Sequence, residues 1–174
     1  VKNEILPKFQ ELYKGNNDFI GWLTIADTKI DYPVMQLIED ENYYMSHDYE
    51  KNENINGSLV LDSDSVAGVG TKEFNYKNGK KPSTNLIIHG HTMRSGEMFG
   101  DLSDYENEDY MKAHKIIKFS SLYEEKFITK KQAQVMYSFC FSSGPAFAIG
   151  AVGVCLLKSK YFIAVQKCEI CTII

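Results

Sequence analysis

The stretch NLIIHGHTMRSGEMFGDLSDY, residues 85–105, joins a short apolar run to two closely spaced histidines. Residues 85–89 have the apolar character and polar flanks of a buried strand. His89 and His91 lie two positions apart, so on an extended backbone both side chains leave the same face. The two histidines therefore belong to one site or to none. In the second case, one histidine packs against its neighbours while the other is a solvated residue at the end of the strand.

The segments on either side predict many short strands and few helices. Apolar positions follow helical spacing in residues 3–14, 98–102 and 108–114, the first segment starting at a possible cap, Asn3. Strand-forming residues fill 21–26, 29–36, 57–62 and 116–119, and the first two of these segments flank a turn. We therefore expect a mainly β fold with some α-helix, arranged as a barrel or a sandwich.

The composition is that of one folded domain covering residues 1–174. Hydrophobic residues make up 44% and charged residues 24% of the chain, which disfavours disorder. The net charge is −4, and no stretch interleaves basic with aromatic residues, so we expect no nucleic-acid partner. The N-terminus has no basic segment followed by an apolar run, and a signal peptide or anchor is not expected within this sequence.

Residues 127–174 differ in composition from the rest of the chain. They contain a single acidic residue, Glu169, and all four cysteines, which are Cys140, Cys155, Cys168 and Cys171. The uncharged run of residues 135–157 is long enough to cross a bilayer. The turn-forming segment SSGP at 142–145 interrupts it, however, and favours two buried strands joined by a turn.

The histidines and cysteines allow two kinds of chemistry. A zinc ion could be held by His89 and His91 together with the C-x-x-C pair Cys168 and Cys171. Alternatively, a cysteine beside a histidine could act as a nucleophile, because the imidazole favours the reactive thiolate and can later protonate a leaving amine. Spacing alone leaves both possibilities open, as well as a cysteine that is only a small buried hydrophobe.

Four segments resemble class B sortases in their order, their spacing and their amino-acid sequences. They are NNDFIGWLTIADTKIDYPVMQ (16–36), ENYYMSHDYEKN (41–52), INGSLVLDSDS (55–65) and the stretch at 85–105. The resemblance covers about residues 5–126 and implies an eight-stranded sortase-type β-barrel with one or more N-terminal helices. It also implies that His91, in the Gly-His dipeptide, is the catalytic histidine, and that His89 is its non-catalytic neighbour. No cofactor is implied.

The resemblance further implies a cysteine transpeptidase on the surface of a Gram-positive bacterium. The thiol would attack the carbonyl after Thr in a C-terminal sorting signal of the NPxTN or LPxTG type. The resulting thioester would be resolved by an amine of the cell-wall peptide, so the partners are a sorting-signal peptide and a peptidoglycan amine. A membrane anchor is implied upstream of the catalytic domain and is absent from this sequence.

Residues 127–174 depart from the family pattern of a Leu-Ser-Thr-Cys strand followed by an arginine. The nearest match is Tyr137-Ser138-Phe139-Cys140, which makes Cys140 the candidate nucleophile. The family's arginine would fall near Ala148, whereas the only arginine in the chain is Arg94. Either this tail is not the natural one, through a frameshift or a sequence error, or the chain is a degenerate relative that binds sorting peptides without turnover.

Overall fold

The computed structural model describes residues 3–72, 75–76, 79–83, 85–114, 116–129, 134–138, 151–155 and 162–168. The helical elements are η1 (Pro7–Phe9), α1 (Gln10–Gly15), η2 (Tyr43–Met45), η3 (Gly100–Glu106) and α2 (Glu108–Ala113). The strands are β1 (Phe19–Ile25), β2 (Asp31–Met35), β3 (Leu59–Leu61), β4 (Asn85–His91), β5 (Ile116–Ser121), β6 (Glu125–Thr129), β7 (Gln134–Ser138), β8 (Ala151–Cys155) and β9 (Phe162–Cys168).

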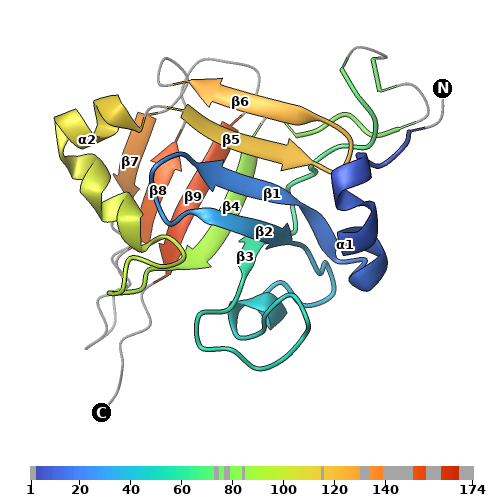
Figure 1. The fold of residues 1–174 in the computed structure, drawn as a ribbon, viewed down its shortest axis with the longest axis horizontal. Coiled ribbons are helices and arrows are strands. Elements are labelled where there is room, and N and C mark those ends of the chain that lie inside the picture. Colours follow the sequence, from blue (N-terminus) through green and yellow to red (C-terminus); the bar gives the residue numbers. More distant parts are fainter. Residues whose placement is uncertain are drawn as a thin grey trace.

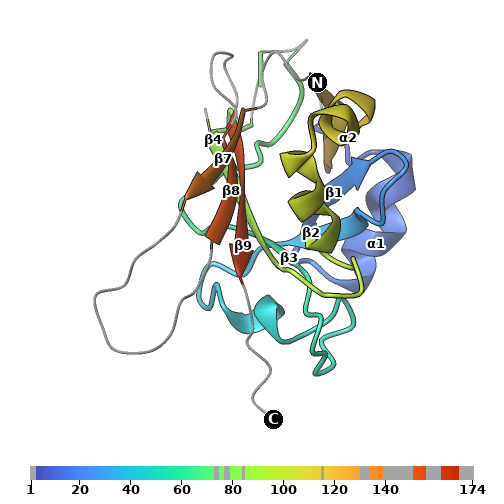
Figure 2. The same cartoon turned by 90° about the vertical axis from the view of Figure 1, so that its left-hand side faces the viewer.

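The described strands form one curled sheet in the order β6-β5-β1-β2-β3-β4-β9-β8-β7. In Figure 1 the helices α1 and α2 lie at opposite ends of this sheet, and Figure 2 shows β4, β9, β8 and β7 standing across from β1 and β2. The predicted mainly β fold with an N-terminal helix is confirmed. Nine strands occur within the described residues, where the resemblance implies eight.

Most of the predicted elements are present at the expected positions. The hairpin predicted at 21–36 is confirmed as the antiparallel pair β1–β2. The N-terminal helical segment begins later than predicted, because Leu6 rather than Asn3 occupies the N-cap and Pro7 opens the first turn. A proline fits that position well, since its fixed φ suits a helix and its missing N–H would have no partner there.

The sheet buries apolar side chains on both of its faces. In β3, Leu59 and Leu61 join the cluster inside the curl, while Val60 between them joins a second cluster outside it. This alternation is the period of two that a strand imposes on its side chains. The outer cluster also receives Phe9 from η1 and Tyr44 from η2, so the N-terminal helices and the η2 segment cover the outer face.

Three strands come from the compositionally distinct part of the chain. Strands β7 and β8 pair antiparallel, and β9 lies between β8 and β4. This arrangement confirms two strands in the uncharged run 135–157, whose connecting residues 139–150 lie outside the described residues. In the part of the chain that the structure describes, no helix is long and apolar enough to cross a membrane.

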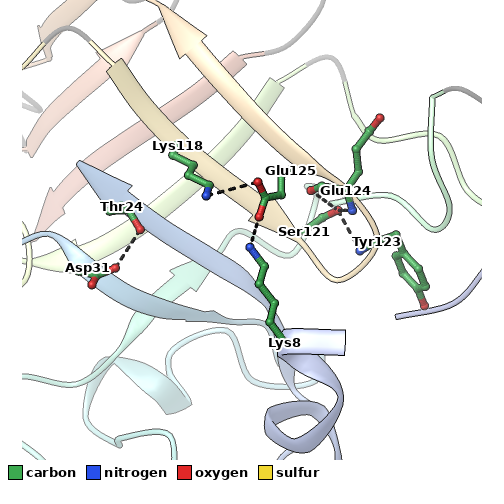
Figure 3. Close-up of polar contacts among 8 residues, drawn as sticks. All are labelled: Lys8, Thr24, Asp31, Lys118, Ser121, Tyr123, Glu124 and Glu125. Carbon is green, nitrogen blue, oxygen red and sulfur yellow. Dashed lines mark hydrogen bonds and ion pairs between the residues drawn. The ribbon is translucent and has the colours of Figure 1, made fainter. Parts of the chain in front are cut away.

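A small ionic cluster links η1 to the β5–β6 hairpin. The Glu125 carboxylate pairs with Lys8 and lies 3.4 Å from the Lys118 ammonium (Figure 3). The backbone N–H of Leu6 also donates to the carbonyl of Leu122 at 2.8 Å. These contacts tie the N-terminal segment to the edge of the sheet.

Candidate active site

His91 is the last residue of β4 and is buried, with 3% of its surface exposed. Its Nε2 atom lies 2.6 Å from the carbonyl oxygen of Met45 in η2. Its Nδ1 atom is also buried and has no hydrogen-bond partner among the described residues. The backbone N–H of Phe99 donates to the His91 carbonyl at 2.8 Å, so the loop after β4 folds back onto the strand.

His89 lies on the same face of β4 but has a different partner. Ile88, which precedes His89, belongs to the inner cluster, and the intervening Gly90 faces Leu59 and Phe99 of that cluster, which confirms the predicted shared face of the two histidines. The His89 Nε2 donates to the Asp62 carboxylate at 3.2 Å, and both side chains are about a quarter exposed, at 27% and 24%. His89 is therefore more accessible than His91.

The cysteines differ in their relation to β4. Strand β9 pairs with β4 in parallel, and the register puts Cys168 opposite His91. In Figures 1 and 2, β9 runs beside β4 and both strands end at the same edge of the sheet. Cys155 lies in β8, which is two strands away from β4, and pairs with Gln134 of β7. Cys140, the nucleophile predicted from the sequence, and Cys171 lie outside the described residues.

Strand β9 was not among the strands predicted from the sequence. Its first four residues, Phe162–Val165, are an uninterrupted apolar run, which is the signal that could have identified it. The position of Cys168 beside His91 follows from the pairing of β9 with β4, a contact between segments about 77 residues apart in the printed sequence. No local motif encodes such a pairing.

Two further expectations concern charged or metal-binding groups. Arg94 is exposed in the loop that follows β4, so it is near His91 in sequence but on the surface. Among the described residues, no group of three or more histidine, cysteine or acidic residues could hold a metal ion. The zinc alternative requires Cys171, which lies outside those residues, and it stays a prediction.

Comparison with known proteins gives a consistent family relationship. No family model matches the sequence. Sortase B of Listeria monocytogenes is 38% identical over 121 residues, which are 70% of this chain and 44% of the relative. The solved sortase B structure from the same species has a TM-score of 0.57 and 33% identity, with 75% of this chain and 67% of that chain covered. The chain belongs to the sortase B family.

A second sortase B structure supports the same fold. The Staphylococcus aureus sortase B–substrate complex has a TM-score of 0.63 and 27% identity, and covers 78% of this chain and 56% of that chain. The chain spans less than half the length of the curated sortase B from L. monocytogenes. The resemblance predicted over about two thirds of the sequence is thereby confirmed.

Proposed function

We propose that this sortase B family member provides the catalytic groups of a cysteine transpeptidase, with Cys168 as the nucleophile and His91 as the acid–base group. The observation that carries the proposal is the register of β4 and β9, in which these two residues are opposite each other. Adjacent strands lie about 4.8 Å apart, a separation that side chains can span. Family membership supports the reaction type.

The reaction is an exchange of one amide bond for another through a thioester. The Cys168 thiolate attacks the carbonyl carbon after Thr in a sorting signal of the NPxTN or LPxTG type, forming a C–S bond. The C–N bond breaks as His91 delivers its proton to the leaving amine. In the second half, an incoming amine loses its proton to His91, forms the new C–N bond and expels the thiolate.

The proposed partners are a surface-protein sorting peptide and an amine of the cell-wall peptide. Solved sortase B proteins have been described in a substrate complex and in a complex with triglycine, which supports a peptide substrate in general. The cellular location that goes with these partners is the outer face of the membrane of a Gram-positive bacterium. An anchor outside this sequence would hold the domain there.

A cleavage assay with fluorogenic sorting peptides tests the proposal. Release of the fluorophore should accelerate when an amine such as triglycine is added, and the ligated product should appear by mass spectrometry. His91→Ala should lower the rate by about 100-fold or more, the usual contribution of a general acid–base group. The control, His114→Ala at the end of α2, should leave the rate within about twofold. Full activity in His91→Ala would contradict the proposal.

A peptide-binding module without turnover is the second candidate. The observation that favours it is the position of Arg94, the only arginine of the chain, which is exposed in the loop after β4. Loss of one oxyanion donor typically lowers a rate by about 100 to 1000-fold. Sorting-peptide binding in calorimetry, without thioester formation in mass spectrometry, would favour this candidate over the enzyme.

A further inference from the structure

We propose that the backbone carbonyl of Met45 is a positioning group that fixes the tautomer of His91. The Met45 oxygen would keep a proton on Nε2 and leave Nδ1 as the basic nitrogen for the thiol. This inference rests on the proposed role of His91 in acyl transfer. The tautomer itself can be measured without any turnover, so the two proposals can be tested separately.

The hydrogen bond between His91 and Met45 determines which nitrogen carries the proton. A carbonyl oxygen can only accept, so the Nε2 atom at 2.6 Å must donate to it. In a neutral imidazole the other nitrogen is then a bare acceptor. That nitrogen, Nδ1, is buried and has no partner among the described residues. Burying a polar atom without a partner costs folding free energy. The cost is consistent with an Nδ1 atom that interacts with another group during the reaction.

The Met45 carbonyl is held in place by its neighbour Tyr44. The Tyr44 side chain is fully buried, its hydroxyl donates to Asp18 at 2.8 Å, and it accepts from Asn16 at 2.7 Å. Burial raises the pKa of Tyr44 above its usual range, so the hydroxyl stays protonated and continues to donate. The Tyr44 carbonyl also accepts from the N–H of Ser58 at 2.7 Å. The backbone on the N-terminal side of Met45 is therefore fixed on both sides.

Gly57 permits the close packing on the other side of the same carbonyl. Its φ is +57°, in the left-handed region, and an added Cβ would lie 2.3 Å from the Met45 oxygen. Real Cβ atoms do not approach an oxygen that closely, so any side chain at 57 must displace the Met45 carbonyl or the turn itself. A glycine outside the β4–β9 pair thus controls the position of the oxygen that binds His91.

The same geometry serves both halves of the reaction. When Nδ1 takes up a proton, Nε2 still donates to Met45, and a hydrogen bond from a charged imidazolium is stronger than one from the neutral ring. The ring therefore keeps one orientation while Nδ1 gains and loses its proton. A freely rotating ring would present either nitrogen, and misplacement of a reacting group by about 1 Å can lower a rate by about 100-fold.

Nitrogen-15 NMR of the imidazole rings in the whole chain tests the inference. At a pH where His91 is neutral, its Nε2 should show the shift of a protonated nitrogen and its Nδ1 that of a bare one, with the signals assigned by their loss in His91→Gln. Gly57→Ala should produce a mixture of tautomers and lower acyl transfer by about 10 to 100-fold. The control, Gly68→Ala, also has positive φ (+94°) but lies in another loop, and it should change neither signal nor rate.

Each result separates the two proposals. A wild-type His91 with its proton on Nδ1, or a Gly57→Ala protein that folds and keeps a single Nε2–H tautomer, would overturn the role of Met45. If Gly57→Ala does not fold, the wild-type tautomer alone decides. The expected tautomer in a protein that cleaves no sorting peptide would support the role of Met45 while contradicting the proposed function.

Discussion

Cys168 is opposite His91 in the parallel ladder formed by β9 and β4. The two residues are the last of their strands, so both lie at the same edge of the sheet. His91 is additionally fixed by the Met45 carbonyl, which comes from the η2 segment on the outer face. The proposed reacting pair thus involves two unrelated parts of the fold, which are strand β9 paired with β4 and the η2 segment whose carbonyl binds the imidazole.

Gly90→Ala should destabilise the protein, because the inner face beside His91 has no room for a methyl group. An added Cβ would lie 2.5 Å from Leu59 and 2.9 Å from Phe99. Overpacking of this kind typically costs about 1 to 3 kcal/mol. Urea unfolding should show that loss with an unchanged m-value. A free energy of unfolding equal to that of the wild type would mean that β4 does not pack against these two residues.

Tyr44→Phe should lower stability by about 1 to 3 kcal/mol, because it leaves the buried amide of Asn16 with one partner fewer. Tyr43→Phe is the matched control. The Tyr43 ring is only partly buried and stacks on His47, a contact that phenylalanine preserves. The difference between the two variants in urea unfolding measures the contribution of the Tyr44 hydroxyl. Equal free energies of unfolding for Tyr44→Phe and Tyr43→Phe would contradict the hydrogen bonds of Tyr44 with Asn16 and Asp18.

Glu125→Gln should show a pH-dependent loss of stability. The hydrogen bond from Lys8, with a smaller contribution from Lys118, lowers the pKa of Glu125 in the folded protein from its ordinary 4.5. The stabilisation is therefore complete above about pH 4.5 and is lost as the pH falls through the lower folded pKa. Because Glu125 is 39% exposed, the effect at pH 7 should stay below about 1 kcal/mol and shrink in high salt.

Urea unfolding at pH 7 and pH 3 checks this prediction. The wild type and Glu125→Gln should differ at pH 7 and converge at pH 3. Glu11→Gln, which alters a pair within α1 whose carboxylate is 84% exposed, should change little at either pH. A difference that grows toward pH 3 would contradict the lowered pKa.

His89→Gln should retain at least a tenth of the transfer rate, in contrast to the loss expected for His91→Ala. Glutamine can still donate to Asp62, which preserves the one polar contact that the His89 ring makes in the described structure. Steady-state cleavage of a sorting peptide provides the measurement. A loss as large as that of His91→Ala would assign His89 a direct part in the chemistry.

The sequence was sufficient to predict those features that depend on residues close together in the chain. The strand-forming residues on either side of the turn at 26–29 predicted the β1–β2 hairpin, and the apolar run 85–89 predicted β4. The shared face of His89 and His91 also followed from the period of a strand. Each of these features depends on residues a few positions apart, so the pattern of side chains alone determines it.

The sequence was insufficient where the site depends on long-range pairing or on backbone atoms. The prediction of Cys140 rests on a local likeness to a family motif and stays a prediction, whereas the pairing that puts Cys168 opposite His91 depends on which strands become neighbours. The contact of His91 with Met45 uses a carbonyl oxygen, which every residue has, so the side chain of methionine gives no signal of it. Gly57 is informative only once its φ is known.

Trapping the acyl-enzyme tests the central claim most directly. Wild-type protein is incubated with a sorting peptide, quenched in acid and digested, and the thioester is located by tandem mass spectrometry, with Cys168→Ala and Cys140→Ala as paired variants. We predict the acyl group on Cys168, its loss in Cys168→Ala and its persistence in Cys140→Ala. An acyl group on Cys140, or an undiminished adduct in Cys168→Ala, would contradict the assignment.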